Sequence, residues 1–354
     1  MGTRIYLDHA ATTPILPEAA EAIRAACETW ANPSSAHAEG RAVRAAMEDA
    51  RRRIGAALGW DGTLIFTSGA TEAIEIVMRR AKAGDRIVSA IEHPAVLRCT
   101  SGEDRLAVQT DGTLDLCDLD SALAGRQRPL VAVQSVNNET GVIHPMARIF
   151  ERVKEGGGLL LADCAQSAGK LPLPDADFIS IAAHKFGGPP GIGALLVRDE
   201  ATLEAVGGQE GGHRPGTAAV PMIMGFAAAC EADHAWYEGA KRLRVTLDRA
   251  IAEAGGEIIA AAAPRIATIA CYRMPGVPAA SQMMQFDLAG IAVSAGSACS
   301  SGSLKASHVL SAMGLAEEEA REVIRVSFGP RTRESDIDAL LSEWRTLHAR
   351  RRAA

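Results

Sequence analysis

The sequence predicts an α/β protein in which a mostly parallel, doubly wound sheet forms a large domain and a smaller α+β domain follows. Three observations support this prediction. Short apolar runs rich in β-favouring residues recur at positions 63–67, 86–90, 129–136, 159–163, 178–183 and 191–197. Helical segments separate most of these runs, which is typical of a parallel sheet with helices on both faces. Polar residues follow several runs, and ligands bind at the carboxyl ends of the strands in such sheets.

Length and composition bound the class of protein. The chain has 354 residues, a formal net charge of −6 and 47% hydrophobic residues. This is enough for two domains, and we expect a large one over 16–235 and a small one made of 1–15 and 236–354. The mildly acidic balance favours neither nucleic acid nor an anionic membrane as a partner. Because no apolar run reaches the length of a membrane span and the N-terminus lacks a signal-peptide pattern, we expect a soluble, cytoplasmic protein.

The first elements precede the sheet. Pro17 suits the first position of a helix that we expect to end at about residue 28. The loop 31–37 contains Asn32, whose side chain either caps the next helix, 40–58, or reaches over a substrate site. Glycine and hydroxyl residues form the turn 68–72 between the strand 63–67 and a helix over 73–81. Thr71 in this turn belongs either to a phosphate site at the helix N-terminus or to an ordinary N-cap.

Polar residues also stand at the ends of the next three strands. His93 follows the strand 86–90 and precedes Pro94, so it either caps a short helix or approaches a ligand. Asn138 lies in the polar tip after the strand 129–136. Asp163 ends the buried strand 159–163, and Gln166 follows three residues later. A carboxylate in this place pairs with a ring nitrogen of a ligand or caps the following turn.

The strand 178–183 ends in His184 and Lys185, and a Gly-Gly-Pro-Pro turn follows. Desolvation at the end of an apolar strand lowers the pKa of a lysine, and an unprotonated amine can form a Schiff base. The alternative is a surface lysine in a turn. A shared position at strand ends favours a pyridoxal-phosphate site, and the residues that share it are Thr71, His93, Asn138, Asp163 and Lys185.

The glycine-rich segment 207–217 includes Thr217 and follows the last strand of the sheet. It is either a linker or a loop that wraps a phosphate or a partner subunit, and it lacks the dinucleotide pattern GxGxxG. The pattern then predicts one helix over 222–251 and strands at 265–272 and 291–294. Arg325 lies inside the apolar strand 323–330, where a guanidinium binds a carboxylate ligand or forms a structural ion pair.

Seven cysteines, an odd number without CxxC pairs, predict neither a disulfide framework nor a metal site. We expect most of them to be small buried hydrophobic residues. Cys299 differs, because almost every residue of 294–304 around it is small. This composition predicts a mobile, exposed loop. An exposed thiol is a liability unless it is used, so we assign Cys299 a functional role.

Nine motifs occur in one order along essentially the whole chain: YLDHAATTP, ANPSSAH, TSGATE, EHPAV, NNETG, DCAQSAGK, HKFGGPPGIG, GSACSSGS and IRVSFG. In these motifs the chain resembles the cysteine desulfurases, pyridoxal-phosphate enzymes of the class V aminotransferase group with the fold type I architecture. The long Ser-rich segment around Cys299 resembles the NifS/IscS branch. The resemblance implies a homodimer that converts L-cysteine to L-alanine and passes the sulfur to an iron–sulfur scaffold or another sulfur-acceptor protein.

The resemblance also implies roles around pyridoxal 5′-phosphate. Lys185 would bond to the cofactor aldehyde, and Asp163 would pair with the pyridinium nitrogen. His93 would stack on the ring and move protons. Asn138 and Gln166 would hydrogen-bond the side of the ring that carries the phenolic oxygen.

The remaining roles concern the phosphate, the substrate and the sulfur. Thr71 and His184 would hold the phosphate, and Thr217 would reach the phosphate bound by the other subunit. The substrate carboxylate would be bound by Arg325 and Asn32. Cys299 would be the nucleophile that takes the sulfur as a persulfide.

Two positions depart from the family pattern. Ala182 stands where the family usually has a hydroxyl residue that binds the phosphate, and Gly211 stands where an arginine is common. Other interpretations are a different class V enzyme, such as a selenocysteine lyase or an aminotransferase, and a catalytically silent paralogue that binds partners. An aminotransferase has no use for Cys299, and a silent paralogue needs neither Lys185 nor Asp163.

Overall fold

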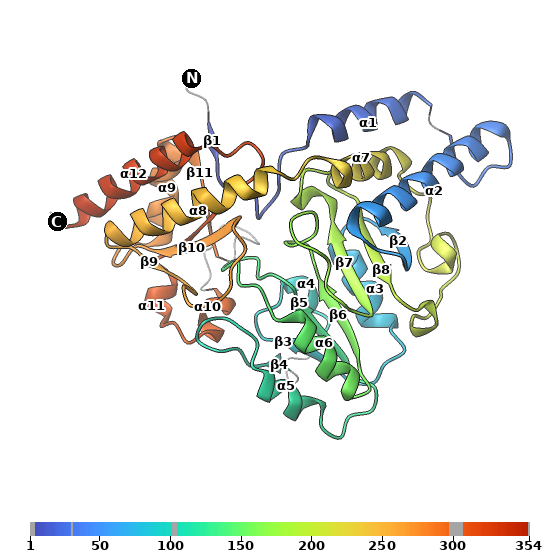
Figure 1. The fold of residues 1–354 in the computed structure, drawn as a ribbon, viewed down its shortest axis with the longest axis horizontal. Helices are drawn as coiled ribbons and strands as arrows, with labels where there is room; N and C mark the ends of the chain where they lie inside the picture. Colours follow the sequence, from blue (N-terminus) through green and yellow to red (C-terminus); the bar gives the residue numbers. More distant parts are fainter. Residues whose placement is uncertain (1–3, 30, 101–104, 297–306, 353–354) are drawn as a thin grey trace.

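A computed structural model describes residues 4–29, 31–100, 105–296 and 307–352 of the chain (Figure 1). Its largest sheet has seven strands in the order β2-β8-β7-β6-β5-β3-β4. Strand β8 pairs antiparallel with both of its neighbours, whereas the pairs β7–β6, β6–β5, β5–β3 and β3–β4 are parallel. The strands are β2 (Thr63–Thr67), β3 (Arg86–Ser89), β4 (Arg105–Leu106), β5 (Leu130–Gln134), β6 (Leu159–Asp163), β7 (Phe178–Ala182) and β8 (Gly193–Val197).

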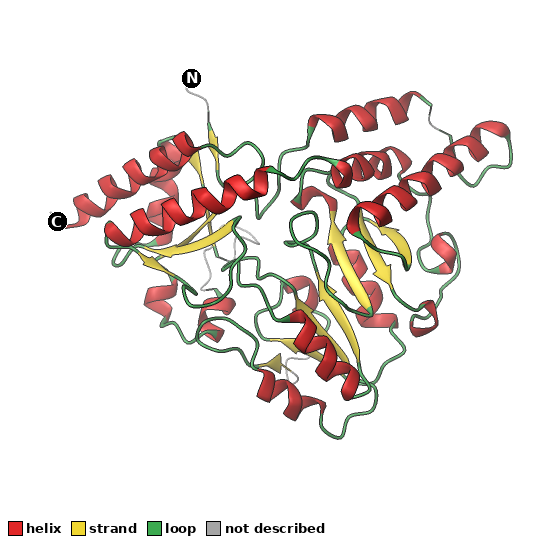
Figure 2. Cartoon of the chain, in the orientation of Figure 1, coloured by secondary structure: helices red, strands yellow, loops and turns green. Residues whose placement is uncertain are grey.

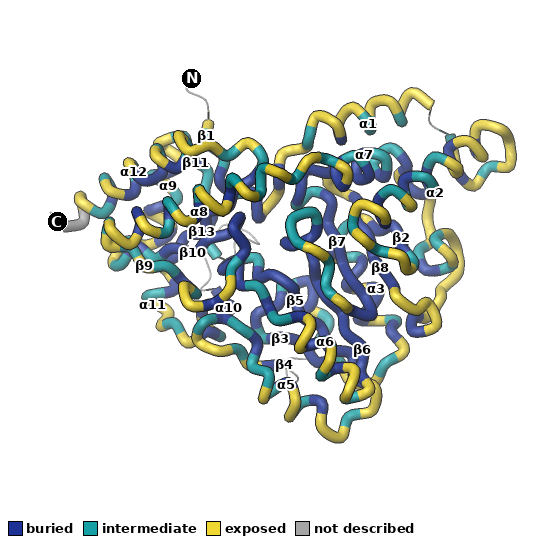
Figure 3. Tube along the Cα trace, in the orientation of Figure 1, coloured by how far each residue is buried: buried dark blue, intermediate teal, exposed yellow. Residues whose placement is uncertain are grey.

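Helices cover both faces of this sheet (Figure 2). They are α1 (Pro17–Glu28), α2 (Ala38–Leu58), α3 (Ala70–Arg80), α4 (Pro94–Leu97), α5 (Leu116–Leu123), α6 (Met146–Glu155) and α7 (Val220–Glu231). Along β2, Leu64 and Phe66 pack in one apolar cluster and Ile65 in another, because successive side chains point to opposite faces. The strands are therefore buried on both sides, as the near-continuous apolar runs predict (Figure 3).

The C-terminal part contains a second, antiparallel sheet in the order β12-β13-β10-β9. Its strands are β9 (Glu257–Ile258), β10 (Ile269–Arg273), β12 (Ser294–Ala295) and β13 (Val323–Ser327). Around it lie α8 (Trp236–Glu253), α9 (Ala279–Leu288), α10 (His308–Ala312), α11 (Glu317–Ala320) and α12 (Glu334–Arg352). None of the helices described in either part is both long and apolar enough to cross a membrane.

The N-terminal segment packs with these C-terminal elements (Figure 1). Strand β1 (Ile5–Tyr6) pairs in parallel with β11 (Ile291–Ala292). Leu7 is fully buried in the same apolar cluster as Tyr272 and Trp344. The division into domains at residues 15 and 235 stays a prediction.

One expectation about the helices is wrong. The segment 222–251, expected to be one helix, forms parts of two helices, α7 and α8. The chain leaves the helical region at Ala232, with φ −62° and ψ 154°. The Asp233 side chain then accepts a hydrogen bond from the backbone N–H of Ala235 at 2.8 Å. Such local bonds of Asp compete with the helix ladder, and the break follows from them.

The cysteines are divided between surface and interior, so the expectation that most are buried is only half right. Cys164, Cys230 and Cys271 are buried, whereas Cys27 and Cys117 are exposed.

Candidate active site

A cavity of about 470 Å³ opens where the parallel strands end, facing the antiparallel sheet. Among the residues that line it are eight of those singled out in the sequence: Thr71, His93, Asn138, Asp163, Gln166, His184, Lys185 and Arg325. They come from six separate segments of the chain. The sheet brings them together because the carboxyl ends of parallel strands meet at one edge.

Lys185 ends a single turn of 3₁₀-helix, Ala183–Lys185, directly after β7. Its Nζ donates to the backbone oxygens of Ala10 at 2.7 Å and Ala11 at 2.9 Å. The hydroxyl of Thr13 in turn donates to the backbone oxygen of Lys185 at 3.1 Å. The amine is therefore held inside the cavity by the N-terminal segment, and the alternative of a surface lysine in a turn is wrong.

Asp163 lies at the end of β6 and is 7% exposed. Its Oδ1 accepts from the hydroxyl of Ser180 at 2.9 Å and from the N–H of Ala165 at 3.0 Å. Ser180 lies beside Asp163 in the register of β6 and β7. One oxygen is thus fixed by the protein, so the carboxylate both closes the turn, as one interpretation predicted, and faces the cavity. Sequence reasoning missed Ser180, although a serine inside an apolar strand was the available signal.

Gln166 is buried beside the same cavity. Its Nε2 donates to the backbone oxygen of Ala10 at 2.9 Å. Within the described chain, its Oε1 is buried and has no hydrogen-bond partner. An unsatisfied buried oxygen is costly, so this atom is suited to a group from a ligand.

His93 is the N-cap of α4, and its Nδ1 accepts from the backbone N–H of Ala95 at 3.1 Å. Burial lowers the pKa of His93; Asp163 opposes this shift and Lys185 adds to it. The ring is therefore neutral at pH 7, with its proton on Nε2 because Nδ1 is the acceptor. His93 thus caps α4, as one interpretation predicted, and it also lines the cavity.

The N-terminus of α3 forms one end of the cavity through Ser68, Gly69 and Thr71. Gly69 is its N-cap, with φ 151°. The free N–H groups and the positive dipole end of such a helix attract anions. His184 and Ala182 lie in the same lining, and burial, together with the charge of Lys185, lowers the pKa of His184 to about 4.

Arg325 approaches the cavity from β13 and is 4% exposed. Its Nη2 pairs with Oδ1 of Asp8 at 2.8 Å, and its Nη1 donates to the backbone oxygen of Asn138 at 2.9 Å. Its Nε is buried without a partner in the described chain. The arginine thus forms the structural ion pair that one interpretation predicted. Asp8, Glu139 and His308 lie at this end of the site and were missed by sequence reasoning.

Residues 5–340 match the family model of the class-V aminotransferases. The chain belongs to this family. It is 36% identical to a cysteine desulfurase of Cereibacter sphaeroides, over 96% of this chain and 94% of that protein. It is also 36% identical to an IscS-like cysteine desulfurase of Mycobacterium tuberculosis, over 99% of this chain and 97% of that protein.

Solved structures agree with these class-V relatives. A NifS-like protein from Rickettsia africae superposes with a TM-score of 0.89 at 31% identity, over 98% of this chain and all of that one. A structure described as SspA in complex with cysteine superposes with a TM-score of 0.80 at 30% identity, over 93% and 99% of the two chains. The predicted mostly parallel α/β fold and the resemblance to cysteine desulfurases are therefore confirmed.

Two of the predicted site residues, Asn32 and Thr217, do not line the cavity of this class-V chain, and a third lies outside the described residues. Asn32 is exposed in the connection between α1 and α2. This connection lies far from the antiparallel sheet (Figure 1). Its Oδ1 accepts from the N–H of Ser34 at 2.9 Å in a local turn. The expectation that Asn32 caps the next helix is wrong, because His37 is the N-cap of α2. Thr217 is exposed at the end of the glycine-rich segment. Cys299 lies in 297–306, outside the described residues.

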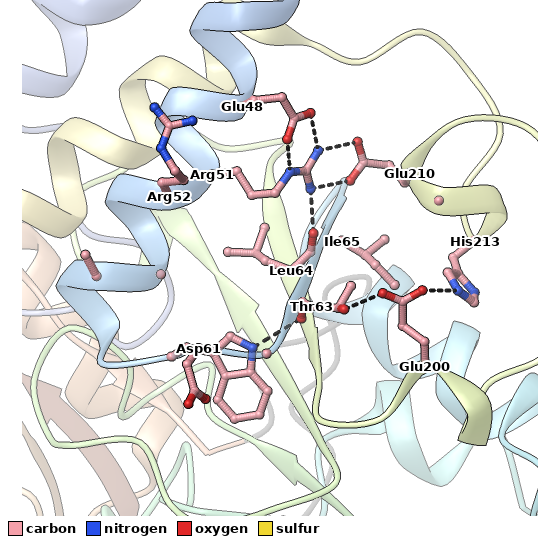
Figure 4. Close-up of a pocket in the computed structure, with 15 residues that line it drawn as sticks. Glu48, Arg51, Arg52, Asp61, Thr63, Leu64, Ile65, Glu200, Glu210 and His213 are labelled. Atoms are coloured by element: carbon pink, nitrogen blue, oxygen red, sulfur yellow. Dashed lines mark hydrogen bonds and ion pairs between the residues drawn. The ribbon is translucent and has the colours of Figure 1, made fainter.

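A larger cavity of about 630 Å³ lies at the outer edge of β2 (Figure 4). Arg51 points into it between Glu48 and Glu210, and it pairs with Glu210 through two bonds of 2.8 and 3.0 Å. Glu210 also accepts from the N–H of Phe66 at 2.8 Å, and Arg51 donates to the backbone oxygen of Leu64. Glu210 and Arg51 thus form hydrogen bonds with one N–H and one carbonyl on the unpaired edge of β2, so this ion pair has a structural function.

Gly211 follows Glu210 in this second cavity. The backbone at Gly211 has φ 63°, a left-handed conformation that costs glycine little and an arginine more. The departure from the family pattern at this position therefore suits the local backbone.

Proposed function

We propose that this protein is a cysteine desulfurase, which converts L-cysteine to L-alanine and leaves the sulfur as a persulfide on Cys299. The observation that carries the proposal is the cavity in which Lys185, Asp163 and Arg325 converge at the ends of the strands. The same chain is 36% identical to cysteine desulfurases over almost its whole length. Fold alone would not assign an activity, because one fold hosts many reactions.

Pyridoxal 5′-phosphate fits the residues of this cavity. Lys185 offers a primary amine to the cofactor aldehyde, and Asp163 offers a buried carboxylate to the ring nitrogen. The unpartnered buried oxygen of Gln166 and the side chain of Asn138 would bind the phenolic side of the ring. When bound, the cofactor supplies an electron sink for the bonds that break at the substrate.

The phosphate would lie at the N-terminus of α3, held by Thr71 and His184. Because Ala182 has no hydroxyl, one bond that relatives of this family usually make to the phosphate would be missing. Thr217 would complete the phosphate site of a second subunit, since it is exposed and lies outside the cavity of its own chain. The proposal therefore includes a homodimer.

Two side chains would act on the substrate directly. His93 would lie against the cofactor ring and hold a proton on Nε2, because its Nδ1 is occupied by the N–H of Ala95. The Nε donor of Arg325 would bind the substrate carboxylate, with the guanidinium oriented by Asp8. Asn32 would assist only across the dimer, because in its own chain it lies outside the cavity.

The step assigned to Cys299 balances without an external oxidant. Its thiolate sulfur forms a bond to the sulfur of the bound cysteine, and the Cβ–S bond of that cysteine breaks. The electron pair of the broken bond stays with Cβ, which takes up a proton and becomes the methyl group of alanine. Cysteine and a thiol thus give alanine and a persulfide. An iron–sulfur scaffold or another sulfur-acceptor protein would then take the sulfur from Cys299.

The test is alanine formation from L-cysteine by the holoenzyme, with a reductant that clears the persulfide. We expect alanine from the wild type and from Cys117→Ala, which changes an exposed cysteine elsewhere, and none from Cys299→Ala. Lys185→Ala is expected to lose the absorbance of bound cofactor above the protein band. Equal alanine from Cys299→Ala would refute the assigned nucleophile, and a wild type that binds the cofactor but forms no alanine would refute the function.

A further inference from the structure

Glu139 is a buried carboxyl group in the cavity that the roles above do not use. It follows β5 in the turn 137–141 and is 2% exposed. Its own backbone N–H donates to Oδ1 of Asn137 at 2.9 Å, so the turn fixes its position. The neighbouring backbone oxygen, of Asn138, accepts from Arg325. A carboxyl group buried this deeply needs partners of its own.

The partner of Glu139 is Ser307. The hydroxyl of Ser307 donates to Oε2 of Glu139 at 2.5 Å and accepts from the N–H of Leu310 at 3.1 Å. Ser307 is thereby the N-cap of α10 and is 4% exposed. Its two bonds join the start of α10 to the turn after β5. A bond between a hydroxyl and a carboxylate is among the stronger hydrogen bonds in proteins.

Gly296 meets the same carboxyl group from the other side. It follows β12, which pairs with β13 beside Arg325, and it lines the cavity. A Cβ atom at Gly296 would lie 2.6 Å from Oε2 of Glu139 and 3.1 Å from Cβ of Ser307. The backbone of Gly296 thus packs directly on the pair, and only glycine allows this approach.

Gly296 and Ser307 are the two described residues that flank 297–306, the segment that contains Cys299. One carboxyl group therefore contacts the chain on both sides of the proposed nucleophile. Covalent geometry limits three residues to a span of about 11 Å. An anchor at Gly296 consequently bounds the distance between Cys299 and the cavity, and a second anchor at Ser307 reduces the volume that the thiol can explore.

We propose that Glu139 is a positioning residue for sulfur transfer: it holds Gly296 and Ser307 at the cavity and so keeps Cys299 within reach of the bound cysteine. This inference rests on the proposed function and deepens it. Glu139 would not contact the sulfur. It would raise the effective concentration of the thiol at the substrate, in the way that a short tether favours an intramolecular reaction.

The experiment separates positioning from binding. Holoenzyme variants Glu139→Ala, Glu139→Gln and Ser307→Ala are compared with Ser311→Ala, which removes an exposed hydroxyl from the same helix. The readouts are the rate of alanine formed in one turnover without reductant and the dissociation constant for cysteine, from the change in cofactor absorbance. A third readout, independent of activity, is the rate of tryptic cleavage after Lys305, followed by mass spectrometry.

We expect Glu139→Ala and Ser307→Ala to slow the single turnover at least tenfold and to speed cleavage after Lys305. The dissociation constant for cysteine should change less than threefold. Glu139→Gln, which keeps an oxygen acceptor, should recover most of the rate, and Ser311→Ala should match the wild type. Because Ser307→Ala keeps the carboxyl group, it tests the same contact if Glu139→Ala fails to fold.

Single turnovers of Glu139→Ala and Ser307→Ala within twofold of the wild type would overturn the inference. So would a loss confined to cysteine binding, since that would make Glu139 part of the substrate site. A wild type that forms no alanine would instead remove the proposed function on which the inference rests. The two failures are therefore distinguishable.

Discussion

Replacing Ala182 by serine is expected to strengthen cofactor binding. Ala182 ends β7, lines the cavity and pairs with Gly193. Gly193 in turn packs on Gly69, because a Cβ atom added to Gly193 would lie 2.7 Å from the Cα of Gly69. Gly69 is the N-cap of α3, where the phosphate is proposed to bind. A hydroxyl at position 182 would thus be placed beside the phosphate.

The size of the effect follows from the bond that is gained. A hydrogen bond to a charged group contributes about 1.5–3 kcal/mol. Fixing the serine side chain costs roughly 0.5–1 kcal/mol of conformational entropy. The net gain is about 1–2 kcal/mol, which corresponds to about a 5- to 30-fold lower dissociation constant for pyridoxal phosphate.

The assay is titration of the cofactor-free protein with pyridoxal phosphate, followed by absorbance of the bound cofactor. Ala182→Cys is the matched control, because a thiol has nearly the same shape and is a much weaker donor. Serine should bind the cofactor more tightly and cysteine should stay close to alanine. If both substitutions tighten binding equally, the gain comes from packing, and if neither does, the phosphate is not at position 182.

Three further predictions concern Ser180, His144 and Glu210. Ser180→Ala removes a 2.9 Å bond to Asp163 and should weaken cofactor affinity about tenfold in the same titration, whereas an unchanged affinity would show that the carboxylate is held without it. Burial lowers the pKa of His144 from 6.5 to about 4, so the unfolded chain binds a proton that the folded protein does not. The free energy of unfolding should therefore fall as the pH drops from about 6.5 toward 4, by up to about 3 kcal/mol from this group, and denaturant titrations of His144→Asn should show a shallower pH slope. Glu210→Ala removes the buried partner of Arg51 and the acceptor of the Phe66 N–H, and leaves Arg51 with only the exposed Glu48. It should cost about 2–4 kcal/mol in chemical denaturation, whereas a loss below about 1 kcal/mol would mean that the pair acts like an exposed one.

Much of the site could be predicted from the sequence because it depends on patterns within short segments of the chain. An apolar run followed by a polar residue defines the end of a buried strand, and parallel strands bring such ends to one edge. Lys185, Asp163 and Thr71 were predicted to lie together in this way and line one cavity. Motif resemblance added specific roles for Gln166 and Arg325, which no periodicity could indicate.

Other features depend on which segments meet in space. The sequence offers two adjacent asparagines after β5, and only the fold separates them. Asn137 is fully buried and its Oδ1 accepts from the N–H groups of Glu139 and Thr140, whereas Asn138 lines the cavity. The break between α7 and α8 is similar, because apolar periodicity continues across a turn that one aspartate closes.

The sequence by itself determined six of the seven strands of the large sheet, the residues at the strand ends and the family, and it missed the two-residue strand β4. Tertiary structure decided the partners: Asp8 for Arg325 across 317 residues, Ser307 for Glu139 across 168 residues and Ser180 for Asp163 across 17 residues. It also decided that Asn32 and Thr217 lie outside the cavity of their own chain. The physical reason is the separation along the chain over which each kind of interaction acts. Hydrophobic period and turn chemistry act over a few neighbouring residues, whereas a buried charge is satisfied by whichever group packing brings within 3 Å.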